Sequence, residues 1–230
     1  MVNKYILAIL LTSILVLMGL ALMIYTGDAG IKRISDAVEA SSLEAESTQQ
    51  LLQYGSLYGD VNGFCPVLMN RADFQSGKVV DVLAELQKAS PGGSGGDLVL
   101  ERESPGNINP EFMLLKRSYL NQSIGLYLLM EQARLQCAGS GASGVKPLVF
   151  FYLDKQYCPD CVAQGKILSS VRDKCGNVRV FALPYDLGIP VAEAIASRYS
   201  VGTAPAIIYS GKKLEGLAAE ESVEQLISCT

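Results

Sequence analysis

The sequence predicts an α/β protein: a C-terminal α/β domain preceded by a transmembrane helix and a mainly helical accessory region. Three observations predict this order. Residues 5–25 form an uncharged apolar run, residues 29–137 carry apolar side chains at helical spacing, and residues 147–230 alternate short apolar runs with helical patterns. The glycine- and serine-rich segment 138–146 is typical of a linker. At 230 residues, the chain can hold one ordinary domain together with a smaller accessory segment.

The N-terminal run from Tyr5 to Tyr25 contains no charged residue and is long enough to cross a bilayer. Its last residues are bulky, and a signal-peptidase site needs small ones, so we expect an uncleaved signal-anchor. Basic residues lie on both sides of the run, and charge therefore does not set its orientation. The expected localisation is a single-pass membrane protein with its soluble domain outside the cytoplasm, the side that the cysteines favour.

The chain has six cysteines, an even number, and four of them lie outside the closely spaced pair Cys158 and Cys161. Even numbers of cysteines are typical of disulfide-bonded proteins in oxidising compartments, which favours an extracytoplasmic location. The alternative is that the dispersed thiols are buried as small apolar side chains in a reducing compartment. The net charge of −4 and the lack of a large Lys/Arg cluster argue against nucleic-acid binding.

The accessory region contains three helical patterns. Ile31 to Gln53 has a thin apolar stripe near heptad spacing, which fits a helix that packs on a neighbour or pairs weakly with a second copy, or a solvated stalk. A second helix is expected from Gly77 to Ala89, after a loop that contains Cys65 and Pro66. The strongest pattern runs from Pro110 to Cys137, because proline suits a first helical turn and a broad apolar face follows it.

Two shorter segments separate these last helices. The glycine-rich stretch 91–96 lacks the Lys-Ser/Thr that follows a phosphate loop, and we interpret it as a flexible loop. Residues 98–102 are expected to form a short strand.

From Pro147 onward, strands and helices alternate. The expected strands are 148–153, 178–183, 206–209 and 213–216, and the expected helices are 159–174, 190–199 and 220–227. The first two strands are joined through a helix and should be parallel, with a right-handed crossover. The last two meet at Ser210-Gly211, which predicts a hairpin. Such a unit buries its sheet between helices on both faces.

The motif Cys158-Pro159-Asp160-Cys161 follows the first of these strands through a short polar turn. Cys158 would lie at a helix N-terminus, where free N–H groups and the helix dipole favour a thiolate. Cys161, one turn later, would be shielded and would resolve a mixed disulfide by attacking Cys158. The charge of Asp160 opposes thiolate formation, so we expect a couple less oxidising than one with histidine there.

A zinc site is the alternative interpretation of this cysteine pair. Zinc needs four ligands, and the chain has no histidine and no second closely spaced cysteine pair. We therefore expect redox chemistry here, without a metal or a cofactor.

Residues 147–230 resemble the thioredoxin superfamily. The resemblance rests on an apolar strand that runs into YCPDC, on the strand–helix–strand order, and on the segment from Ser200 to Pro205 just before a strand. It implies a thioredoxin fold, a cis Ala204–Pro205 peptide bond, and a Pro205 that lies beside both cysteines and presents backbone to the substrate. The catalytic residues that follow are Cys158, Cys161 and Pro205.

Three positions depart from thioredoxin itself. Tyr157 precedes the first cysteine in place of tryptophan, and Tyr152 occupies the strand position where thioredoxins bury an aspartate. Ala182 occupies the position of the partnering lysine. Proton transfer would then use water, Asp154, Asp160 or another carboxylate.

The remaining cysteines fall at helix ends or in the accessory region. Cys175 and Cys229 end the first and last helices of the C-terminal domain and would meet if those helices share a face of the sheet. Cys65 and Cys137 would then tie the accessory helices together. Free thiols at all four positions are the alternative.

These patterns predict a membrane-anchored thiol–disulfide oxidoreductase. Its substrates would be protein thiols or disulfides, and an electron-transfer partner that the sequence does not identify would restore it. The alternative is a catalytically weak binding or scaffolding module, in which the helical region recognises a partner. Loss of insulin reduction in a Cys158→Ser variant would support the enzyme.

Overall fold

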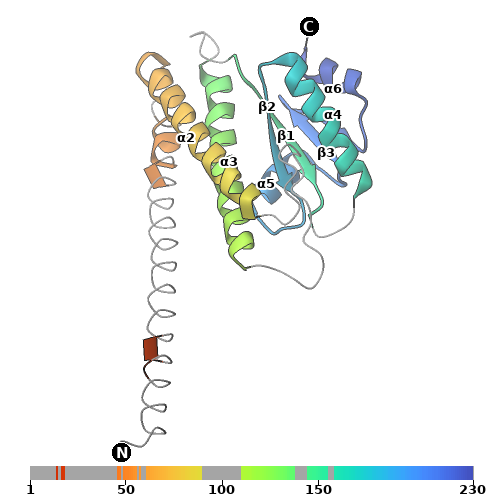
Figure 1. Ribbon diagram of the computed structural model, residues 1–230. Coiled ribbons are helices and arrows are strands. Elements are labelled where there is room, and N and C mark those ends of the chain that lie inside the picture. Colours follow the sequence, from red (N-terminus) through yellow and green to blue (C-terminus); the bar gives the residue numbers. More distant parts are fainter. Residues whose placement is uncertain are drawn as a thin grey trace, which may run out of the picture. The chain divides into compact units, whose positions relative to one another are not determined.

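The computed structural model describes residues 14, 17–18, 46–47, 49–55, 57, 61–89, 110–137, 144–154 and 158–229 (Figure 1). The chain divides into two compact units, Met1–Gln49 and Gln50–Thr230. Nearly all described residues belong to the second unit, and the fold below is the fold of that unit.

The described part of the second unit contains the five helices labelled in Figure 1 and one four-stranded sheet, and residues 50–55 are helical as well. The helices are α2 (Val61–Ala89), α3 (Pro110–Gln136), α4 (Pro159–Cys175), α5 (Pro190–Arg198) and α6 (Glu220–Ile227). The strands are β1 (Lys146–Tyr152), β2 (Val178–Pro184), β3 (Ala206–Tyr209) and β4 (Lys212–Glu215), in the spatial order β2-β1-β3-β4. β1 and β2 are parallel, whereas β3 is antiparallel to both β1 and β4. The parallel pair and the β3–β4 hairpin confirm the sequence prediction, and together they make a mixed sheet.

The sheet is covered on both faces, because alternate residues of β1 point to opposite sides. Val149 and Phe151 belong to a hydrophobic core shared with α2, α3 and α5. Leu148, Phe150 and Tyr152 belong to a second core shared with α4 and α6. Burial on both faces explains why β1 is a continuous apolar run instead of an alternating one. In Figure 1, α2 and α3 lie along one side of the sheet, and α4 and α6 along the other.

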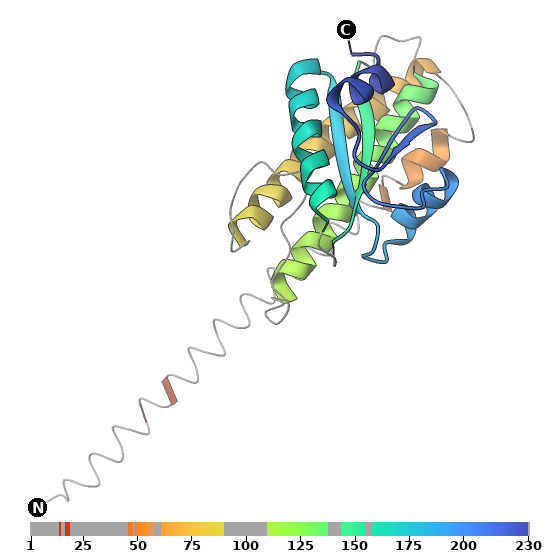
Figure 2. The ribbon, with the colours of Figure 1, turned by 90° about the vertical axis from the view of Figure 1, so that its right-hand side faces the viewer.

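The helix α2 begins at Val61, well before the predicted start at Gly77, and it continues through Pro66. A proline inside a helix removes one backbone hydrogen bond and costs about 3 kcal/mol. Buried apolar residues in the added turns, among them Phe64 and Leu68, offset this cost by packing into the core. α2 and α3 lie side by side in both views (Figure 2). The predicted loop at Cys65 and Pro66 was therefore wrong, because tertiary packing outweighs the local helix-breaking signal.

The expected transmembrane helix requires a correction. In the part of the chain that the structure describes, no helix is both long and apolar enough to cross a membrane. α2 and α3 have the length, but charged residues are distributed along both. The fold class is therefore corrected to the α/β unit with its helical region. The same finding corrects three predictions that depended on the transmembrane helix: the signal-anchor, the membrane anchoring and the single-pass localisation. Of the run 5–25 itself, Ile14, Leu17 and Met18 are described, and the other residues lie outside the description.

Several other expectations fall on residues that the structure does not describe. They concern most of the helix predicted at 31–53, the loop at 91–96, the strand at 98–102 and Tyr157. Most of the linker 138–146 is also outside the description, and the domain boundaries stay predictions.

Candidate active site

The predicted catalytic residues gather at the edge of the sheet where β1 ends. β1 stops at Tyr152, and α4 begins at Pro159, directly after Cys158. β3 is antiparallel to β1 with Ala206 opposite Phe151, so Pro205 also lies at the carboxyl end of β1. The register therefore brings Cys158, Cys161 and Pro205 to one edge from segments about 45 residues apart.

Cys158 and Cys161 form a disulfide at the N-terminus of α4. Cys158 is the N-cap residue, and its Sγ accepts a hydrogen bond from the backbone N–H of Cys161 at 3.2 Å. The two sulfurs differ in access, because Cys158 is partly exposed whereas Cys161 is only 1% exposed. Pro159 occupies the first helical turn, and the carboxylate of Asp160 lies exposed in the same turn. An attacking group from another protein can thus reach Cys158 more readily than Cys161.

The Ala204–Pro205 peptide bond is cis, as the resemblance implies. Pro205 is buried, and its carbonyl accepts a hydrogen bond from the backbone N–H of Gly216 at 2.8 Å. Just before it, the backbone N–H of Gly202 donates to the Glu215 carboxylate at 2.7 Å. This N–H and the Lys213 ammonium hold the pKa of Glu215 below its usual value. The end of β4 therefore holds the segment that leads into Pro205.

A buried ion pair joins α3 to the segment between β1 and Cys158. The ammonium of Lys116 pairs with the carboxylate of Asp154, and their side chains are only 3% and 10% exposed. The backbone N–H of Asp154 also donates to Asp186, at 2.7 Å from Oδ1. Asp154 was one predicted proton carrier, and the structure shows it paired with a cation.

Lys116 was not among the site residues predicted from the sequence. A signal was present, because Lys116 lies four residues after Phe112 and four before Leu120, on the face of α3 that is buried. A charged residue in the middle of an apolar helical face is costly to bury alone, so it predicts a partner of opposite charge.

Tyr152, the last residue of β1, occupies the position where the resemblance implies an aspartate. Burial raises its pKa well above the ordinary value, and the negative charge of Asp154 raises it further. The side chain is therefore a neutral phenol at neutral pH. The last residue of β1 therefore carries no charge.

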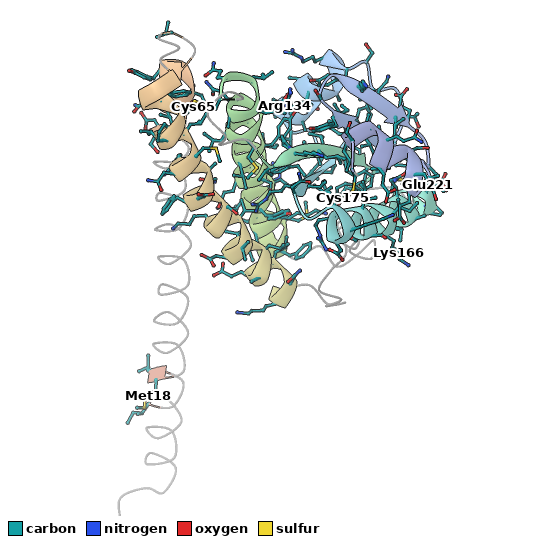
Figure 3. The ribbon with its side chains drawn as sticks, turned by 90° about the horizontal axis from the view of Figure 1, so that it is seen from above. Met18, Cys65, Arg134, Lys166, Cys175 and Glu221 are labelled. Atoms are coloured by element: carbon teal, nitrogen blue, oxygen red, sulfur yellow. A yellow bond between two sulfur atoms is a disulfide. The ribbon has the colours of Figure 1, made fainter. Side chains whose placement is uncertain are left out.

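The other four cysteines form two further disulfides. Cys65–Cys137 joins α2 to the residue after α3, and Cys175–Cys229 joins the last residue of α4 to the second residue after α6. Figure 3 labels Cys65 and Cys175, one partner of each bond. Both predicted pairings are confirmed. The 17 residues of α4 separate Cys175 from the Cys158 end by about 25 Å, at 1.5 Å per residue.

Among the described residues, no cluster of three or more metal-ligating side chains is placed to hold an ion. A scan against protein-family models found no match for this chain, and a search of curated proteins found none either.

Proposed function

We propose that this chain is a thiol–disulfide oxidoreductase related to the thioredoxin superfamily, which exchanges disulfides with other proteins through Cys158 and Cys161. The observation that carries the proposal is the arrangement of the two sulfurs. An accessible sulfur caps a helix and is bonded to a buried one in the next turn, beside a cis proline. The parallel β1–α4–β2 unit followed by the β3–β4 hairpin supports the relation to that superfamily.

The exchange proceeds in two displacements. A thiolate of a protein substrate attacks the Cys158 sulfur, the Cys158–Cys161 bond breaks, and Cys161 leaves as a thiolate. A second thiolate of the substrate then attacks the substrate sulfur of the mixed disulfide, and Cys158 leaves. The substrate loses two electrons and gains a disulfide, while the protein becomes a dithiol. The same steps in reverse reduce a substrate disulfide, and an electron-transfer partner, a dithiol or a disulfide, restores the starting form.

The N-terminus of α4 stabilises the Cys158 thiolate in this cycle. The Cys161 N–H already points at the Cys158 sulfur. A helix N-terminus favours negative charge, so a thiolate at this position is a better leaving group than an ordinary thiol. The exposed residues Gly202 and Thr203 leave the backbone before Pro205 accessible to an extended substrate segment.

An exchange assay tests the proposal. The wild-type protein should catalyse reduction of insulin by a small dithiol, or oxidation of a reduced peptide, and Cys158→Ser should abolish both activities. The matched control is the double variant Cys175→Ser/Cys229→Ser, which removes a disulfide at the far end of α4 and should keep the activity in its folded fraction. Equal rates for wild type and Cys158→Ser would contradict the proposal.

A further inference from the structure

Gln164 is a fully buried polar residue of α4, one helical turn after Cys161. Its side chain is 0% exposed. The carbonyl oxygen Oε1 accepts a hydrogen bond from the backbone N–H of Ala218 at 2.7 Å. The amide nitrogen Nε2 is buried as well and has no hydrogen-bond partner. A buried donor without an acceptor destabilises the state in which it occurs, so this amide calls for an explanation.

Helix geometry places the Gln164 side chain on the same face of α4 as Cys161. Residues three apart lie on the same face of a helix, and helical side chains lean toward its N-terminus, over the preceding turn. Cys161 lies in that turn and is itself 1% exposed. The bond from Ala218 identifies the oxygen end of the amide and leaves the NH₂ group free for another acceptor. In the disulfide form, the Cys161 sulfur is bonded to Cys158 and carries no charge.

We propose that Gln164 Nε2 donates a hydrogen bond to the Cys161 sulfur when the Cys158–Cys161 disulfide is reduced. The inference rests on the proposed function. Reduction breaks the sulfur–sulfur bond with two electrons from a substrate dithiol, and Cys161 leaves as a thiolate inside the protein. A charged acceptor makes a stronger hydrogen bond than a neutral one, and a buried charge without a donor is costly.

Gln164 therefore affects the redox equilibrium through both the disulfide form and the dithiol form. Its NH₂ group lacks a partner in the disulfide form and gains one in the dithiol form, which favours the dithiol. The same bond favours ionisation of Cys161, and the thiolate is the species that attacks a mixed disulfide on Cys158. Gln164 thus lowers the barrier to release of the substrate while making the couple more oxidising.

The equilibrium between the full-length protein and glutathione tests this inference. Gln164→Met keeps the length of the side chain and removes the donor, and it should shift the equilibrium about tenfold toward the disulfide. The loss of the Ala218 bond affects both redox forms and cancels from the equilibrium. The matched control is Gln75→Met, which changes a buried amide of α2 whose Nε2 donates to the Gln122 carbonyl. This variant should leave the equilibrium unchanged.

Two further measurements separate a direct contact from a general effect on packing. In a Cys158→Ser background, Gln164→Met should raise the pH at which Cys161 ionises, as followed by thiolate absorbance. In the wild-type protein, the side-chain amide protons of Gln164 should move downfield in the NMR spectrum on reduction, whereas those of Gln75 should not. Because the NMR measurement needs no substitution, a Gln164→Met variant that fails to fold does not prevent the test.

An unchanged glutathione equilibrium in Gln164→Met, or an equal shift in Gln75→Met, would overturn the inference. Amide protons of Gln164 that do not move on reduction would overturn it too. None of these measurements uses a protein substrate. A failed insulin assay would therefore overturn the proposed function alone, and a normal insulin assay with an unchanged equilibrium would overturn the role of Gln164 alone.

Discussion

Lys116 carries a positive charge on the buried face of α3, and its partner Asp154 lies in the segment that follows β1. Both side chains have left water, and their mutual attraction compensates for the lost hydration only while both are present. The pair links the helical region to the segment that leads into Cys158. Its effect on stability can therefore be measured apart from the redox chemistry.

Replacing Lys116 by methionine should lower the free energy of unfolding by about 3–5 kcal/mol, because Asp154 would remain as a buried charge without its cation. Denaturant unfolding of the oxidised protein measures this change. The double variant Lys116→Met/Asp154→Leu should regain part of the loss, because it removes both charges. A double variant whose loss equals the sum of the two single losses would show that the charges do not interact.

Glu215 should make stability depend on pH in the acid range. Its pKa in the folded protein is lowered from the ordinary value of 4.5, mainly by the Gly202 N–H and then by Lys213. The stabilising contribution is therefore fully present above about pH 4.5 and is lost as the pH falls through the folded-state pKa. The melting temperature of Glu215→Gln should be below that of the wild type at neutral pH, and the difference should shrink in acid.

The control for Glu215→Gln is Glu85→Gln, a change at an exposed residue of α2 that lies outside the first helical turn. Its melting curve should follow that of the wild type at every pH. A constant difference between Glu215→Gln and the wild type from neutral to acid pH would contradict the role of the Glu215 carboxylate.

For single residues, the sequence predicts a role where the motif lies within a short stretch of the chain. Cys158 and Cys161 form a motif at fixed spacing, and Pro205 follows from the resemblance. Lys116 and Gln164 could not be assigned roles in the same way, because the partner of Lys116, Asp154, and the group that orients the Gln164 amide, the Ala218 N–H, both lie far away in the chain. Only a folded sheet brings those pairs together.

Among the elements, α2 and α3 depend on each other through the Cys65–Cys137 disulfide, whose partners are 72 residues apart in sequence. Closing a loop of that length in the unfolded chain corresponds to about 4 kcal/mol of stability in the chain-entropy treatment. The double variant Cys65→Ser/Cys137→Ser should therefore lose about that amount in denaturant unfolding. A loss well below 1 kcal/mol would indicate that packing alone holds the two helices together.

The sequence predicts the bounds of α4 to α6 and of the four strands to within about two residues, because local sequence patterns and tertiary packing favour the same structure there. Pro159 and Pro190 mark helix starts, and Ser210-Gly211 marks the hairpin. The predicted start of α2 at Gly77 was wrong, because Gly63 and Pro66 indicate a helix break when only the local sequence is considered. Burial of Phe64 and Leu68 in the core, invisible to a local pattern, reverses that preference.

In the whole molecule, the helical region and the α/β domain share one hydrophobic core. Phe64 and Leu68 of α2 and Leu120 of α3 belong to the same buried cluster as Phe151 and Phe181 of the sheet. The glycine-rich composition of 138–146 predicts a linker, but composition cannot show that the flanking parts pack together. The sheet face opposite α4 and α6 is thus completed by helices from the N-terminal side of that linker.

The apolar run 5–25 predicted a membrane span from hydropathy and length alone. Within the described ranges, no helix is long and apolar enough to cross a membrane, and the long helices α2 and α3 both carry charged residues.

If Cys158 exchanges disulfides with other proteins and Cys161 resolves the mixed disulfide, a variant without Cys161 should trap its substrates. Full-length Cys161→Ser is incubated with a disulfide-containing protein, and the adducts are mapped by mass spectrometry without reduction. We expect a mixed disulfide at Cys158 that a dithiol releases and that Cys158→Ser/Cys161→Ser does not form. No adduct, or adducts spread over the other four cysteines, would contradict this role of Cys158.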